Sequence, residues 1–131
     1  MRTILIVIVF ISITFILGCS RQNLAPVSGI VIYEGQPLPD ADICFLPEEA
    51  KNHTVSVRTG INGRFTLTTF KKNDGVTPGR YKVIVSKLEE QGSKNFRPLI
   101  PTHYNLPNKS GLTVDVPTKG IKDLKFELTS K

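Results

Sequence analysis

Few side chains in this sequence are of the types that catalyse reactions or hold metal ions. The chain has two histidines, His53 and His103, and two cysteines, Cys19 and Cys44. A zinc site needs three or four ligands, usually with one closely spaced pair, and both histidines lie in segments that we expect to be loops. Nucleophilic catalysis needs an oriented base beside the nucleophile, and Cys44 has no basic neighbour in the sequence. The sequence therefore predicts no catalytic residue, no metal site and no cofactor.

The turn sequence Gly60-Ile61-Asn62-Gly63 is the place where a calcium loop comes into consideration. Calcium needs several oxygen ligands, including carboxylates. Here Gly60 stands where an acid would be required, and Arg64 adds a positive charge. We interpret the segment as a tight hairpin turn between two strands, because Asn-Gly is suited to the backbone conformation of such turns.

Cys19 lies in a context that points to lipid chemistry. A positively charged start is followed by the short apolar stretch Ile4–Leu17, which is typical of a secretory signal peptide. Its 14 residues are fewer than the roughly 20 that a membrane-spanning helix needs. The quartet Ile16-Leu17-Gly18-Cys19 resembles a bacterial lipobox, in which the cysteine is acylated on sulfur and cleavage occurs just before it. We expect a lipoprotein signal peptide at 1–18, and the alternative is an uncleaved anchor over 3–20.

The charge of the chain excludes one class of partner. Its 17 basic and 11 acidic residues give a formal net charge of +6. The basic residues are scattered, and Lys71-Lys72 is their only adjacent pair after the N-terminus, so the pattern is not that of a nucleic-acid-binding protein. A mild cationic bias is compatible with contact to anionic lipid or acidic polysaccharide. The length after residue 18 is that of one small domain.

Alternation of apolar and polar residues predicts seven strands separated by Gly, Pro and Asn turn signals. Their expected ranges are Val27–Tyr33, Ala41–Leu46, Val55–Thr59, Arg64–Thr69, Arg80–Lys87, Leu112–Val116 and Ile121–Leu128. Every second residue then faces one core: Val27, Val31, Tyr33, Ile43, Phe45, Val55, Val57, Phe65, Leu67, Tyr81, Val83, Val85, Leu112, Val114, Val116, Leu124, Phe126 and Leu128. The proline-rich segment 88–111 does not fit this pattern, and a loop of that length is often functional or mobile.

Four strings carry a family resemblance: VSGIVIYEGQPLPDADICFLP, TGINGRFTLTTF, DGVTPGRYKVIVSK and IPTHYNLPNKSGLTVDV. Over 27–128 the chain resembles small bacterial lipoproteins with a carboxypeptidase regulatory-like, transthyretin-like domain. The resemblance implies an all-β, seven-stranded antiparallel Greek-key sandwich of the prealbumin type, preceded by an N-terminal signal helix. It implies no activity, because this module does no chemistry in the metallocarboxypeptidases that carry it. Related ring-opening hydrolases end in a Tyr-Arg-Gly-Ser-like tail, which this chain lacks.

We therefore expect a signal peptide at 1–18, a tether at 19–26 and a β-sandwich domain at 27–131. The expected function is that of a non-catalytic, lipid-anchored binding or scaffolding module of the cell envelope. It would be held at the cell membrane or outer membrane through acylated Cys19, and it would face the periplasm or the exterior. Its partner would be an envelope protein or a glycan. The alternatives are a carbohydrate-binding module and, third, a transthyretin-related hydrolase.

Five residues are candidates for partner contact. Ile30, Ile32 and Ile84 lie on the strand faces opposite the core, where an apolar patch marks an interaction site unless loops cover it. Phe96 and Tyr104 lie in the 88–111 segment. Sugar-binding modules stack their ligands on exposed Trp or Tyr, and the chain has no Trp, so Tyr104 is the residue that a carbohydrate-binding role would use.

Overall fold

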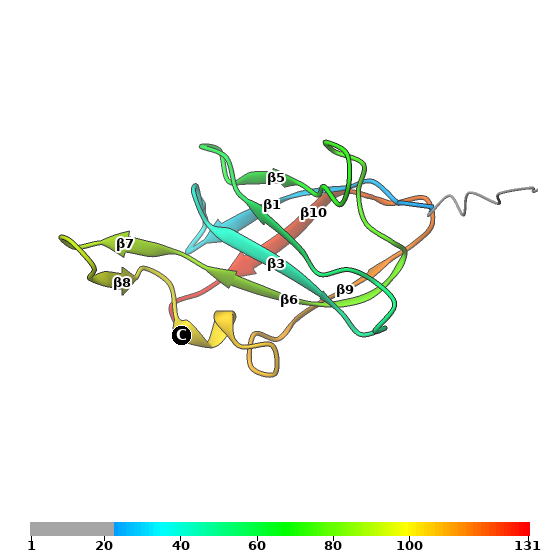
Figure 1. Cartoon of the computed structure of the whole chain (residues 1–131). Helices are drawn as coiled ribbons and strands as arrows, with labels where there is room; N and C mark the ends of the chain where they lie inside the picture. Colours follow the sequence, from blue (N-terminus) through cyan, green and yellow to red (C-terminus); the bar gives the residue numbers. More distant parts are fainter. Residues whose placement is uncertain (1–22) are drawn as a thin grey trace, which may run out of the picture.

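The computed structural model describes residues 23–131, which form an all-β fold (Figure 1). The elements are β1 (Val27–Tyr33), β2 (Gln36–Pro37), β3 (Asp42–Pro47), β4 (Val55–Arg58), β5 (Arg64–Thr66), β6 (Gly79–Ser86), β7 (Leu88–Glu90), β8 (Phe96–Pro98), the 3-10 helix η1 (Thr102–Asn105), β9 (Leu112–Val116) and β10 (Ile121–Leu128). The expected signal peptide and Cys19 lie outside the described residues. No helix within 23–131 is long and apolar enough to cross a membrane.

Two four-stranded sheets and one two-stranded ribbon make up the fold. In the first sheet, β1 lies between β10 on one side and β2 and β5 on the other. The second sheet has the antiparallel order β4-β3-β6-β9. The pairing of β1 with β10 is parallel, with Val31 opposite Phe126. The prediction of a wholly antiparallel fold is therefore wrong at this pair, because alternation fixes which side chains face inward but not the direction of a strand.

Aromatic side chains join the two sheets. Phe45 of β3 lies 6.1 Å, between ring centroids, from Tyr81 in its own sheet and from Phe65 and Phe126 of the other sheet. Phe65 and Phe126 also stack on each other at 6.2 Å. Separations of this size, with tilted or edge-on rings, are favourable for aromatic pairs. All of the residues predicted to face the core are buried or half-buried, so the inward assignment is confirmed.

The folded body begins earlier than the predicted boundary at Val27. Ala25 is fully buried and pairs with Val76 through two backbone hydrogen bonds of 2.7 and 2.9 Å. Ala25, within the expected 19–26 tether, is therefore part of the core, whereas Pro26 is exposed. Leu38 and Ile100 are further core residues that strand alternation did not identify, because they lie outside the strands. Ala41, at the start of the expected strand Ala41–Leu46, is also buried but was not among the residues predicted to face the core.

The segment Gly60-Ile61-Asn62-Gly63 forms a tight turn but not the predicted hairpin. The turn is closed by Gly63 N–H donating to Gly60 O at 3.0 Å. However, β4 pairs with β3 and β5 pairs with β1, so this turn carries the chain from one sheet to the other. Gly63 has a positive φ of 75°, and a Cβ there would lie 2.8 Å from the carbonyl oxygen of Val31. A short turn signal does not reveal which sheet the next strand joins.

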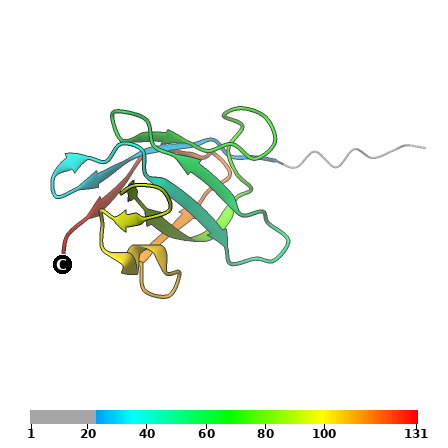
Figure 2. The same cartoon turned by 60° about the vertical axis from the view of Figure 1, so that its left-hand side comes forward.

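The two ends of the sandwich differ in what they carry (Figures 1 and 2). Residue 23 begins at one end, together with the loop over residues 67–76 and the turn at 117–120; we call this the N-terminal end. The β7–β8 ribbon projects from the opposite end, where the C-terminus also lies. Surfaces on the two ends are therefore separated by the length of the sheets.

We expect Phe45→Ala to lower the free energy of unfolding by about 3–5 kcal/mol, because the vacated volume lies between both sheets. Urea denaturation of a chain beginning at Gln22, which retains every described residue, measures this. Phe96→Ala is the matched control: its ring is 62% exposed, and we expect a change within about 0.5 kcal/mol. A loss below about 1 kcal/mol for Phe45→Ala would contradict its central position.

Candidate binding site at the β7–β8 hairpin

The 88–111 segment begins with a β-hairpin that extends the second sheet. β6 ends at Ser86, and β7 starts two residues later and pairs with β8. Gln91 N–H donates to Asn95 O at 2.7 Å at the turn, and Leu99 N–H donates to Lys87 O at 2.9 Å at the base. The hairpin therefore has a defined backbone geometry although it lies beyond the core.

One face of the hairpin is exposed and carries three apolar side chains and one carboxylate. Leu88 lies opposite Pro98, and Glu90 lies opposite Phe96, so these four side chains share a face. Leu88 is 57% exposed and Phe96 62%. Leu88 and Pro98 also line a pocket of about 110 Å³, whose floor includes Ile100. We call this face and the adjoining groove the hairpin site.

The groove beside the hairpin has an open volume of about 660 Å³ and carries both charged and apolar groups. Its lining comprises Asp40, Asp42, Arg58, Lys87, Leu88, Glu89, Glu90, Phe96 and Leu99. Most of its charges are already engaged within the protein. The hydrogen bond and charge of Asp42, 2.9 Å away, raise the pKa of Arg58. Lys87 donates to Pro39 O at 2.6 Å.

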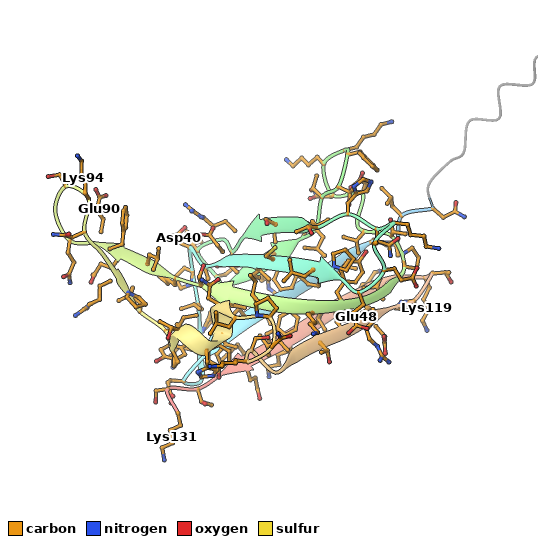
Figure 3. The ribbon with its side chains drawn as sticks, turned by 60° about the horizontal axis from the view of Figure 1, so that its bottom comes forward. Asp40, Glu48, Glu90, Lys94, Lys119 and Lys131 are labelled. Carbon is orange, nitrogen blue, oxygen red and sulfur yellow. The ribbon has the colours of Figure 1, made fainter. Side chains whose placement is uncertain are left out.

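Two carboxylates of the groove form no ion pair within residues 23–131, although the charge of Asp40 also acts on Arg58. Glu89 accepts from Arg97 at 3.0 Å, whereas Asp40 and Glu90 form no ion pair with any residue in 23–131. Figure 3 shows Glu90 on the projecting hairpin and Asp40 beside its base. A ligand with an apolar side chain and a positive charge would thus complement both the hairpin face and the groove.

The backbone of β7 offers a further recognition element. The backbone N–H and C=O groups of Lys87 and Gln91 point toward β8, as their hydrogen bonds to Leu99 and Asn95 show. Because these groups alternate in direction along a strand, those of Leu88 and Glu90 point to the other edge. No strand within the described residues pairs with that edge. An extended peptide can add to such an edge through main-chain hydrogen bonds.

The five predicted contact residues fall in different places. Phe96 belongs to the hairpin site. Tyr104, expected to be exposed, is buried at 7%: it lies on η1, and its hydroxyl accepts from Thr129 N–H at 2.9 Å. The prediction of Tyr104 as a sugar platform is therefore wrong, because the 3-10 helix turns its ring toward the end of β10.

The three outward isoleucines do not form one patch. Ile30 and Ile32 are on β1 in the first sheet, whereas Ile84 is on β6 in the second sheet, opposite Cys44. All three are half-buried. Because the inner faces of the two sheets pack together, their outer faces lie on opposite sides of the molecule.

The residues considered for catalysis lie apart. His53 packs edge-on against Phe70 at a ring separation of 5.5 Å, and His103 packs against Tyr104 at 4.1 Å. Cys44 is half-buried on β3. Within residues 23–131, no three His, Cys, Asp or Glu side chains come together as metal ligands would.

Sequence reasoning missed Leu88, Asp40 and Glu90 as members of this site. The position of Leu88 could have been inferred from the sequence. Tyr81, Val83 and Val85 face the core at every second position, and Leu88 is out of phase with them, so its side chain cannot belong to the same inward face. Asp40 and Glu90 are separated by 50 positions, and nothing in the sequence indicates that they line one groove.

Comparison with known proteins adds little to this geometry. No family model and no curated protein matches the chain. Among solved structures, a 9R-lipoxygenase from Cyanothece PCC8801 is similar over 82% of this chain, with 11% identity and a TM-score of 0.35. This chain spans 16% of that lipoxygenase, and a likeness this weak supports no functional argument.

The apolar face predicts binding of a solvatochromic dye. We expect Leu88→Ser with Phe96→Ser to lower the Nile red fluorescence of the protein about twofold or more, because the largest apolar surface of this end is removed. Ile61→Ser is the control, since Ile61 is 92% exposed and lies on the β4–β5 turn. Equal fluorescence loss in both variants would show that the hairpin face is no preferred apolar site.

Proposed function

We propose that this protein is a non-catalytic, lipid-anchored component of the cell envelope that binds a partner protein through the hairpin site. The signal-peptide pattern and the lipobox-like Gly18-Cys19 junction support export and acylation of Cys19. The observation that carries the binding role is the hairpin itself. Among residues 23–131, it combines an exposed, mainly apolar face, a groove with two carboxylates that form no ion pair, and a strand edge that pairs with no other strand.

The position of the hairpin supports presentation to a partner. Residue 23 and the β7–β8 ribbon lie at opposite ends of the sandwich (Figure 1). An anchor attached at Cys19 would leave the hairpin on the side away from the membrane. The favoured ligand is an extended segment of an envelope protein that has one apolar residue for the pocket and one basic residue for Asp40 or Glu90. Burial of Tyr104 weighs against the glycan alternative.

We also propose that the domain is a prealbumin-type Greek-key sandwich like that of the carboxypeptidase regulatory-like lipoproteins. All seven expected strands have a counterpart in β1, β3, β4, β5, β6, β9 and β10, and this supports the assignment. The short strands β2, β7 and β8 would then be additions to that framework. The parallel β1–β10 pair differs from the wholly antiparallel sandwich that the resemblance implied.

A photo-crosslinking residue at Lys94, on the hairpin turn, tests the proposal in the full chain in bacterial membranes. We expect a discrete protein adduct that Leu88→Ser with Phe96→Ser abolishes, because the apolar face holds the partner. Intact-mass analysis of the same preparation should show loss of residues 1–18 and added acyl mass on Cys19.

Lys119 is the matched control position, since it is exposed and lies at the N-terminal end (Figure 3). Equal adducts from Lys94 and Lys119 would contradict the hairpin as binding site. An intact Met1 in the mature protein would contradict cleavage. Hydrolase activity that His53→Ala or His103→Ala abolishes would contradict a non-catalytic role.

A further inference from the structure

A second exposed surface lies at the N-terminal end, on the loop between β5 and β6. Phe70 is the residue at issue: it is 62% exposed and is followed by Lys71 and Lys72, both exposed. The His53 ring packs against the Phe70 ring at 5.5 Å between centroids, with the two rings nearly perpendicular. An exposed aromatic ring flanked by lysines combines an apolar group and positive charges at one loop tip.

Asp74 holds this loop in a fixed shape. Its carboxylate accepts hydrogen bonds from the backbone N–H groups of Thr69, Phe70 and Lys71, at 2.7, 2.9 and 2.7 Å. Burial alone would raise the pKa of Asp74, but these three donors outweigh it and the pKa lies below its ordinary value. The loop is thus preorganised with Phe70 in solvent, and its one carboxylate is turned to the loop backbone rather than to the lysines.

The loop lies next to the point where the chain enters the fold. Val76, in the last part of the loop, pairs with Ala25. The turn at 117–120 meets the same segment from another side, since Ile121 N–H donates to Pro26 O at 2.9 Å. Lys119 on this turn lies at the N-terminal end (Figure 3). The aromatic loop and Lys119 therefore flank the segment Ala25–Pro26.

The lysines of this surface are free to act on a ligand. Lys71, Lys72 and Lys119 form no ion pair with a residue in the described part of the chain. The acids on the neighbouring 47–54 loop are Glu48 and Glu49, and Glu49 pairs with Lys51 at 3.4 Å. The surface around Ala25 consequently presents three lysines without an ion pair in residues 23–131, together with one aromatic ring. The carboxylate of Asp74 is bound by the loop backbone, and the charge of Glu48 acts on Arg80.

We infer that Phe70, Lys71, Lys72 and Lys119 form a contact surface for an anionic lipid bilayer, on which the domain rests with the hairpin pointing away. The inference rests on the proposed anchor at Cys19. Ala25 follows Cys19 by six positions, so at most about 20 Å of extended chain separates it from the lipid. Lysines near an anionic surface attract it, and an adjacent aromatic ring is suited to the interface.

Tryptophan fluorescence of the full chain in vesicles tests this surface directly, because the natural sequence has no tryptophan. Phe70→Trp and Phe96→Trp form a matched pair, since both rings are 62% exposed and lie at opposite ends. In vesicles of phosphatidylglycerol and phosphatidylcholine, we expect the emission of Phe70→Trp to shift to the blue and to be quenched by brominated lipid. The emission of Phe96→Trp should stay that of a solvent-exposed indole.

Charge reversal separates lipid electrostatics from simple proximity. Adding Lys71→Glu and Lys72→Glu to Phe70→Trp should reduce the quenching by about half or more, because the anionic surface then repels the loop. Lys94→Glu with Lys131→Glu reverses the same number of charges at the hairpin end (Figure 3) and should leave the quenching of Phe70→Trp unchanged.

The outcomes distinguish this inference from the proposed anchor. An acylated protein in which Phe70→Trp keeps a solvent-like emission would overturn the bilayer contact alone. A protein whose mass shows no acyl group on Cys19 would overturn the anchor, and the bilayer contact with it. Quenching that is equal in pure phosphatidylcholine would reject anionic lipid, and a blue shift confined to native membranes would indicate a protein partner instead.

Discussion

The contact of Phe45 with aromatic rings of both sheets is the interaction on which the rest of the structure depends. Phe45 meets Tyr81 within its own sheet and Phe65 and Phe126 across the interface. Because these rings fill the space between the layers, the sheets cannot slide without losing several contacts at once. Because the two sheets hold one relative position, the elements that project from the two ends of the sandwich also keep a constant distance and orientation relative to each other.

Each end carries a surface that the core does not require. At one end, the β7–β8 hairpin exposes Leu88 and Phe96 beside a groove with two carboxylates that form no ion pair within residues 23–131. At the other, Asp74 shapes a loop that exposes Phe70 and two lysines. Large apolar side chains in solvent cost solubility, so their presence on two shaped elements favours a role in binding. Within residues 23–131, the groove side chains without an ion pair are the acids Asp40 and Glu90, whereas those of the proposed contact surface at the N-terminal end are lysines.

The strands and their inward faces could be predicted from the sequence because alternation reports burial directly, as for Val83 and Val85 of β6. Which strands pair with each other could not be predicted from the sequence. The Gly60–Gly63 turn has the sequence of a hairpin, yet it joins two sheets, and the direction of β10 follows from packing that no local pattern records. The candidate site could be predicted only in part. Phe96 and Tyr104 are both aromatic residues in the expected 88–111 loop, but only Phe96 is exposed, because the 3-10 helix buries Tyr104. Groove residues such as Asp40 and Glu90 meet only through the fold.

The central claim is that the protein sits on the bilayer by its N-terminal end and presents the hairpin outward. Lysine footprinting of the unmodified, full-length protein with a soluble amine-reactive reagent, followed by mass spectrometry, tests it most directly. Relative to the protein in neutral detergent, anionic vesicles should protect Lys71, Lys72 and Lys119 and leave Lys94 and Lys131 fully reactive. Protection of Lys94 with continued labelling of Lys71 and Lys72 would contradict the account, as would a uniform change at all five lysines.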